Sequence, residues 1–244
     1  MLMPPRFSII IPAIHEEAVI NSTIEHLETL DASASMEIIV VDGDGSGKTI
    51  GAVRNGNVKT AISEKGRGNQ MNRGASIAQG DIVIFLHADT RLPPDAFDLM
   101  EGALNDPDCI AGAFDLAIAS GRPIYRLIAK IASFRSRLTR IPYGDQTFFF
   151  RRVYFNEIGG FASIPLMEDV EIMRRIKKRG ERITIISQAV TVSARRWEKE
   201  GILVCTLRNW LLISLYFAGV SPERLSRFYK DTDKIIASRT MLFC

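Results

Sequence analysis

Continuous runs of apolar residues alternate with amphipathic or glycine-rich segments at the start of the chain. Runs that are apolar throughout, rather than at every second position, are typical of parallel strands covered on both faces. The predicted elements are strands at Phe7–Ala13, Glu37–Gly43, Val58–Ser63 and Asp81–Thr90, and helices at about Glu16–Leu30 and Arg67–Gln79. This order predicts an α/β fold with a Rossmann-like, mostly parallel sheet flanked by helices.

The second half of the chain has a more mixed pattern. The predicted elements are strands at Ile110–Ala119, Asp145–Phe155 and Ile183–Ala194, and helices at Pro123–Thr139, Pro165–Gly180 and Ile202–Gly219. The sequence contains no internal repeat, low-complexity segment or linker. We therefore expect a single domain over residues 1–244.

Composition narrows the functional classes. A hydrophobic share of 46% and a charged share of 24% are ordinary for a globular protein, and a net charge of +3 does not indicate nucleic acid. The three cysteines, Cys109, Cys205 and Cys244, form no C-x-x-C pair, which favours a reducing compartment over a disulfide framework or a zinc site. No apolar run reaches the roughly 18 residues of a spanning helix, so we expect a cytoplasmic protein.

The segment Ile38–Gly51, "IIVVDGDGSGKTIG", resembles a phosphate-binding P-loop that follows a strand. That pattern, G-x-x-x-x-G-K-[ST], requires a glycine at position 42, where this chain has Asp42. A carboxylate at that position would place negative charge beside the backbone N–H groups that hold phosphates. The sequence therefore argues against a P-loop.

Polar residues at the ends of the predicted strands indicate a different nucleotide site. The carboxyl ends of parallel strands gather at one edge of a sheet, where ligands bind. Asp42 could accept a hydrogen bond from a nucleobase or ribose, and Asp89 could hold a divalent cation against a diphosphate. Each residue also has a purely structural alternative, because Asp42 could cap a turn and Asp89 could cap the following helix.

Six motifs in order resemble the family-2 glycosyltransferases with a GT-A fold. They are "SIIIPAIHEE", "IIVVDGDGSGKT", "GRGNQMNRGA", "DIVIFLHADT", "YGDQTFFFRR" and "MEDVEIMRRIKKRG". The chain most resembles the small bacterial branch called radical-SAM/selenodomain-associated transferase 2. The resemblance implies inverting transfer of a sugar from a nucleotide-diphosphate donor, with Mg²⁺ or Mn²⁺. It also implies a nucleotide-binding half, about residues 1–90, and an acceptor half, about residues 91–244.

The same resemblance implies roles for individual residues. In the nucleotide-binding half, Pro12, Ala13 and Glu16 match the nucleotide-contacting end of the first strand, Asp42 matches the base-binding aspartate and Arg67 the basic loop residue. His87-Ala88-Asp89 stands at the D-x-D metal motif, which makes Asp89 the expected metal ligand. His87 replaces the first aspartate and could ligate the metal or contact the donor sugar or ribose. "DGDGSGKT" also departs from the usual "DGGSTDGT", which puts Gly47 at the position of an aspartate.

An inverting displacement needs a carboxylate that takes the proton of the acceptor hydroxyl. The resemblance assigns this role to Asp169, with Glu168 as a neighbour or acceptor contact, at the start of a predicted helix whose dipole stabilises an anion. Asp145, in "GDQ", is a secondary candidate for the base or for contact with acceptor and leaving group. Without the resemblance, an acidic pair serving only helix stability is the simpler interpretation of Glu168 and Asp169.

Two C-terminal features have open interpretations. "SARRWEKEG" resembles the Q-x-x-R-W signature of processive synthases, with Ser193 in place of glutamine, so Arg195 or Arg196 could contact donor phosphates and Trp197 the acceptor. A surface arginine pair beside a packing tryptophan is equally compatible. The apolar helix near Trp210–Val220 could lie at the inner face of a membrane and suit a lipid-linked acceptor, cover the sheet, or form a homodimer contact.

Two other functions compete with glycosyl transfer. A sugar nucleotidyltransferase would also use carboxylates at strand ends, but it needs a basic, glycine-rich signature after the first strand, where "PAIHEEAVI" is acidic. A catalytically inactive nucleotide-sugar-binding protein is the second alternative, favoured by His87 and the altered "DGDGSGKT" loop.

Overall fold

The computed structural model describes residues 4–30 and 35–229, and these residues build one eight-stranded sheet. The strands are β1 (Phe7–Ala13), β2 (Met36–Asp42), β3 (Lys59–Ile62), β4 (Ile82–Phe85), β5 (Thr90–Arg91), β6 (Cys109–Ala119), β7 (Phe148–Arg151) and β8 (Arg182–Ser193). Their order in the sheet is β3-β2-β1-β4-β7-β6-β8-β5. Only β7 and β5 run antiparallel to their neighbours in this sheet, which confirms the predicted mostly parallel α/β fold.

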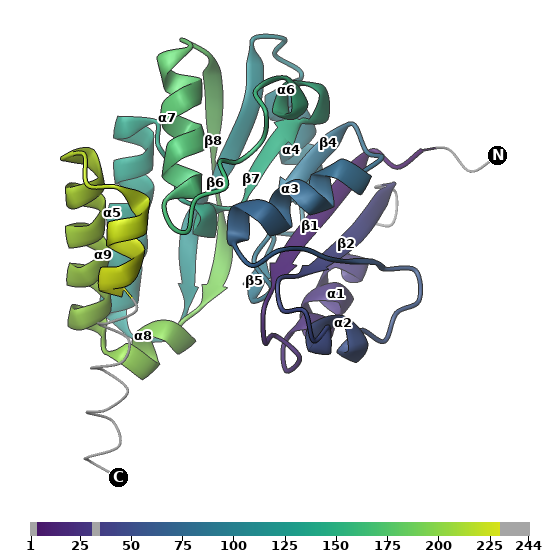
Figure 1. Cartoon of the computed structure of the whole chain (residues 1–244). Coiled ribbons are helices and arrows are strands. Elements are labelled where there is room, and N and C mark those ends of the chain that lie inside the picture. Colours follow the sequence, from purple (N-terminus) through teal and green to yellow (C-terminus); the bar gives the residue numbers. More distant parts are fainter. Residues whose placement is uncertain (1–3, 31–34, 230–244) are drawn as a thin grey trace.

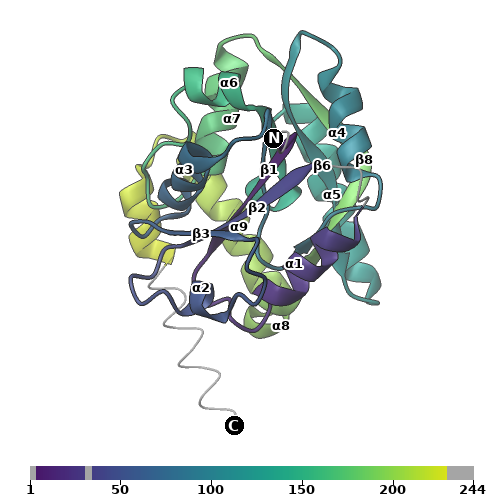
Figure 2. The same ribbon diagram turned by 90° about the vertical axis from the view of Figure 1, so that its right-hand side faces the viewer.

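Helices cover both faces of the sheet (Figures 1 and 2). They are α1 (Ile20–Thr29), α2 (Lys48–Ala52), α3 (Arg67–Ile77), α4 (Ala96–Leu104), α5 (Pro123–Thr139), the 3₁₀ turn η1 (Gly144–Gln146), α6 (Arg152–Glu157), α7 (Glu168–Lys178), α8 (Arg195–Glu200) and α9 (Ile202–Phe217). On one face the core joins the strands to α1 and α4, and on the other to α3, α6 and α7. None of the helices in the described ranges has the length and apolarity needed to cross a membrane.

The strand predicted at Asp145–Phe155 is wrong at both ends. The chain forms η1 first, pairs with β4 only over Phe148–Arg151, and then turns into α6. The pairing with β4 stops at Arg151 because β4 begins at Ile82, directly opposite it. The backbone N–H of Arg152 donates to the Asp81 carbonyl and closes the ladder.

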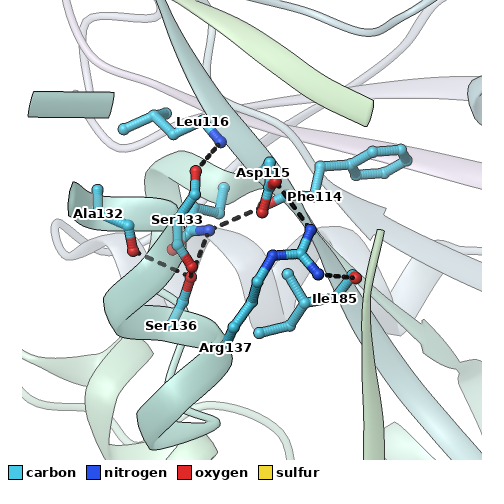
Figure 3. Close-up of polar contacts among 9 residues, drawn as sticks. Phe114, Asp115, Leu116, Ala132, Ser133, Ser136, Arg137 and Ile185 are labelled. Carbon is cyan, nitrogen blue, oxygen red and sulfur yellow. Dashed lines mark hydrogen bonds and ion pairs between the residues drawn. The ribbon is translucent and has the colours of Figure 1, made fainter. Parts of the chain in front are cut away.

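Helix α5 is fastened to the sheet by polar side chains rather than by a broad apolar face (Figure 3). The Leu116 N–H donates to Ser133 Oγ at 3.0 Å. Arg137 forms an ion pair with Asp115 at 2.8 Å, and Gln146 donates both to the Phe114 carbonyl and to Ser136 Oγ. Apolar contact with β6 and β8 is limited to a small cluster around Tyr125 and Ala129. The two serines therefore face inward on this helix.

Candidate active site

A cavity of about 530 Å³ lies at the carboxyl ends of β1 and β4, enclosed by the start of α7 and by α8 and α9. Of the predicted site residues, those that line it are Pro12, Glu16, Arg67, His87, Asp89, Asp145, Glu168, Asp169 and Arg196. They come from loops that are far apart in the sequence, and the shared sheet edge brings them together. Arg195 and Trp197 also line the cavity.

Asp42 does not line this cavity, and its contact with the nucleotide stays a prediction. Its side chain is 0% exposed and does not line the cavity. One carboxylate oxygen accepts from the Asp44 N–H at 2.8 Å, and the other from the Thr49 N–H at 3.0 Å. Asp42 therefore shapes the loop before α2, the turn-capping role that the sequence left open, because a buried carboxylate needs hydrogen-bond donors.

Ala13 is likewise not on the cavity wall. It is buried, and its carbonyl accepts hydrogen bonds from the Gly43 N–H and from Gln70. The Gln70 amide also donates to the Val41 carbonyl and so ties the ends of β1 and β2 together. A Cβ at Gly43 would lie 2.7 Å from the Gln70 side chain, so the glycine permits this close approach. Gln70 could not be recognised from the sequence, since a glutamine within a helical segment carries no sign of burial.

Three of the carboxylates that line the cavity are Asp145, Glu168 and Asp169. Asp169 lies in the first turn of α7, where its oxygens accept from the Gly144 N–H at 2.8 Å and from the Val170 N–H at 2.8 Å. Gly144 lies between Asp169 and His87. A Cβ at this position would lie 3.4 Å from Asp169 Oδ2 and 3.5 Å from His87 Nε2. The neighbouring Glu168 is buried, 3.8 Å from the Arg67 guanidinium.

The surroundings of these groups shift their pKa values. Burial raises the pKa of Asp145 to about 6, with Arg135 opposing the shift and Asp169 adding to it. Burial and the charge of Asp169 also raise the pKa of Glu168, against the attraction of Arg67. Burial lowers the pKa of Arg135 to about 10, which still leaves it cationic at neutral pH. Arg135 could not be singled out from the sequence, because arginines are common on amphipathic helices.

The histidine of the H-A-D motif is neutral. Burial, followed by the charges of Arg67, Arg196 and Arg195, lowers the pKa of His87 well below its usual value. A neutral imidazole can ligate a metal or exchange hydrogen bonds with a sugar. Among the described residues, no group of three or more His, Cys, Asp or Glu side chains could hold a metal ion.

Arg195 joins two acidic residues of the cavity wall, Glu16 and Asp89. It bonds to Glu16 at 2.6 and 2.7 Å, and its Nε lies 3.0 Å from Asp89 Oδ2. Glu16 and Asp89 therefore already share a cationic partner, the Arg195 guanidinium. Such a site fits Mg²⁺ or Mn²⁺, because Mg²⁺ is commonly held by one or two carboxylates together with substrate phosphates.

Some residues with a strained backbone lie at or beside the cavity wall. In the described part of the chain, four residues other than glycine have positive φ: His15, Arg140, Thr147 and Met167. His15 precedes Glu16, and Met167 precedes Glu168 and lines the cavity itself. Thr147 follows η1, and its buried hydroxyl has no hydrogen-bond partner. Such strain costs energy and is typical of functional sites.

The raised pKa of Asp145 gives a stability prediction. With a folded-state pKa of about 6 against an ordinary 3.8, native Asp145 binds a proton more readily than unfolded Asp145. Its charge therefore opposes folding above about pH 6, and the penalty disappears as pH falls towards 4. Asp145→Asn should raise the free energy of unfolding by about 1–3 kcal/mol at pH 7.5, and by much less at pH 4.5.

Urea denaturation at the two pH values measures this difference. The matched control is Asp95→Asn, since Asp95 is exposed and its removal should change stability little at either pH. A gain from Asp145→Asn that is equal at both pH values would contradict the assigned cause.

Comparison with known proteins identifies the family of this chain and its relatives in fold. The sequence profile of glycosyl transferase family 2 matches residues 8–165. The chain is 27% identical over 221 residues to the "Probable glycosyltransferase YdaM" of Bacillus subtilis (strain 168), an alignment covering 80% of this chain and 51% of that protein. It is 33% identical over 114 residues to a dolichol-phosphate mannosyltransferase of Mycosarcoma maydis, covering 41% of this chain and 39% of the relative. The chain thus spans about half or less of these relatives.

Solved structures share the fold at low identity. The mannosyltransferase PcManGT from Pyrobaculum calidifontis, in complex with GDP-Man and Mn²⁺, superposes with a TM-score of 0.59 at 22% identity, over 79% of this chain and 57% of that one. Residues 1–349 of S. aureus TarS, in complex with UDP, give a TM-score of 0.58 at 16% identity, over 77% and 60%. Asp169, Arg195 and α9 lie beyond the region matched by the family profile. With that profile covering more than half of its length, the chain belongs to glycosyl transferase family 2.

Proposed function

We propose that this protein transfers a glycosyl group from a UDP- or GDP-sugar to an acceptor hydroxyl, with inversion at the anomeric carbon. The observation that carries the proposal is the position of Asp169. Its carboxylate borders the cavity in the first turn of α7 and is held by the Gly144 N–H, next to neutral His87. Family membership and the likeness to nucleotide-sugar-bound structures support the donor class.

Asp169 would act as the base. The acceptor oxygen forms the new bond to the anomeric carbon as its proton passes to Asp169, and the bond to the diphosphate breaks. Two backbone N–H groups, those of Gly144 and Val170, hold the Asp169 carboxylate in its orientation. Glu168, buried against Arg67, is the neighbouring acceptor contact. Asp145 has a pKa near neutrality and lies on the same side, where it would meet the acceptor and leaving group.

The first ninety residues would form the nucleotide-binding half and the rest the acceptor half. Pro12, Glu16 and Arg67 border the cavity on the nucleotide side, and Arg196 borders it from α8. Asp89, with His87 as a second candidate, would hold a divalent cation that offsets the charge developing on the diphosphate. Arg195 would then release Asp89 or share it, because a guanidinium and a metal ion compete for the same carboxylate.

Calorimetric titration tests donor class and metal dependence together. UDP, GDP and ATP are titrated with and without Mn²⁺ or Mg²⁺. We expect one of the diphosphates to bind at least about tenfold more tightly with the cation, and Asp89→Asn to remove that gain. Asp95→Asn, an exposed aspartate near the same loop, should retain it.

Tight binding of ATP without binding of UDP, GDP or their sugars would overturn the proposal. A screen for slow donor hydrolysis across UDP- and GDP-sugars then identifies the sugar without requiring the acceptor.

A further inference from the structure

The outward face of α5 is apolar. Residues spaced three and four apart along one side of this helix are large, hydrophobic and exposed: Ile124, Leu127, Ile131, Phe134 and Leu138. This spacing places them on a single stripe. The opposite side carries Tyr125, Ala129, Ser133 and Ser136 and packs on the sheet partly through serine hydroxyls (Figure 3). The usual arrangement of a surface helix is thus reversed.

Helix α9 repeats this arrangement. Its exposed apolar side chains are Leu203, Val204, Leu207, Trp210, Leu211 and Phe217. Its other side buries Cys205 and Leu212. Both helices lie along the same flank of the molecule, at the left of Figure 1 and on the side turned away from the viewer in Figure 2. Soluble monomers rarely expose large apolar patches, so two exposed apolar stripes on one flank favour a partner for this α5–α9 flank.

Basic residues border the α5–α9 flank. The α5 segment Pro123–Thr139 contains no Asp or Glu, and its exposed Arg126 and Lys130 stand beside the apolar stripe. Where the ends of α5, α7 and α9 meet, a groove is lined by Ile141, Glu171, Arg174, Arg175, Lys177, Lys178, Tyr216 and Phe217. Its one acidic residue, Glu171, is paired with Arg175 at 2.8 Å, so Arg174, Lys177 and Lys178 give the groove a basic character. Arg174 lies 5.3 Å from the Tyr216 ring centre and 5.1 Å from that of Phe217.

We propose that the α5–α9 flank binds the surface of an anionic membrane. Apolar stripes containing Phe and Trp, bordered by Arg and Lys, are what an interfacial helix presents to acyl chains and acidic headgroups. A second copy of the chain fits less well. A two-fold contact would face this patch with itself and bring the two basic borders together, where like charges repel.

The position of α9 links the membrane to the cavity. Its inner side contributes Cys205, Asn209, Leu212 and Ile213 to the cavity wall. A bilayer on its outer side would therefore lie about one helix diameter, ~10 Å, from the cavity. On the proposed function, this favours an acceptor hydroxyl carried by a lipid. Membrane binding itself does not depend on that function.

Co-sedimentation of the full chain with vesicles tests the inference. One set of vesicles is pure phosphatidylcholine. The other contains 30% phosphatidylglycerol, which gives the vesicles an anionic surface. We expect binding to the anionic vesicles that weakens as NaCl increases. Phe134→Asp combined with Leu207→Asp should weaken it by about tenfold or more, since these side chains are 68% and 62% exposed on the two stripes. Arg126→Glu with Lys130→Glu should reduce binding to anionic vesicles specifically.

Val153→Asp is the matched control. Val153 is 66% exposed on α6, away from the α5–α9 flank, and its replacement should leave binding unchanged. Because all replaced side chains are exposed, circular dichroism and UDP or GDP titration should show folded, nucleotide-competent variants. The inference is overturned if the wild-type chain ignores anionic vesicles or if Val153→Asp weakens binding equally. A wild-type dimer that Phe134→Asp dissociates, without vesicle binding, would overturn it in favour of self-association.

Discussion

Asp169→Asn is expected to lower the turnover number for glycosyl transfer by about 10³-fold while leaving donor binding within about twofold of wild type. A general base contributes 10²- to 10⁴-fold to a rate, and an amide cannot take the acceptor proton. The amide oxygen can still accept the Gly144 N–H bond that the carboxylate accepts at 2.8 Å, so the cavity should keep its shape. Steady-state turnover and calorimetric titration of the nucleotide measure the two quantities separately.

Glu171→Gln is the control for this substitution. Glu171 lies on the same helix and forms an ion pair with Arg175 rather than reaching the cavity wall. Its replacement should leave turnover nearly unchanged. If Asp169→Asn retains more than about a tenth of wild-type turnover, the base is a different group. Asp145 is then the next candidate, and its pKa of about 6 would appear as the acid limb of the pH–rate profile.

Asp42→Ala is expected to lower the free energy of unfolding by about 2–4 kcal/mol and to weaken nucleotide binding through the loss of the loop. The substitution leaves the N–H groups of Asp44 and Thr49 without their buried acceptor. Urea denaturation measures the first effect and titration with UDP or GDP the second. A direct nucleotide ligand would behave differently, because its removal would weaken binding while stability stayed the same.

Asp44→Ala is the control that distinguishes the loss of loop shape from the loss of a negative charge in the same loop. Asp44 lies in the same loop, and its carboxylate bonds only to the neighbouring Ser46 hydroxyl and N–H, beside His15. We expect a much smaller change in stability than for Asp42→Ala. Equal effects of the two substitutions would reject the view that Asp42 organises the loop from within.

Most of the site was predictable because parallel strands end at a common edge. The motifs after β1 and β4 were expected to meet, and Glu16, Arg67, His87 and Asp89 do line one cavity. Asp42 also stands at the end of a parallel strand, but its side chain does not line the cavity. Whether a carboxylate at a strand end faces a ligand or its own loop depends on the backbone N–H groups around it. The residues of the motif do not reveal where those backbone N–H donors lie.

Contacts between segments that are far apart in the chain could not be predicted from the sequence. Arg195 lies 179 positions from Glu16, and either arginine of "ARRW" could have faced the donor side. The structure pairs Arg195 with Glu16 and Asp89, and Arg196 with Glu200. The turn of α8 makes that choice by setting the direction of each side chain.

The sequence by itself determined the alternation of strands and helices, the mostly parallel sheet, and the amphipathic character of α5 with its bounds at Pro123 and Thr139. Those properties follow from local spacing of apolar residues, which a single segment carries. Only the tertiary structure decided which face of α5 turns inward. The N–H of Leu116 and the amide of Gln146 bond to serine hydroxyls on that helix, and the apolar stripe is left outside. Periodicity shows that a helix has two faces, whereas the partners across the fold determine which one is buried.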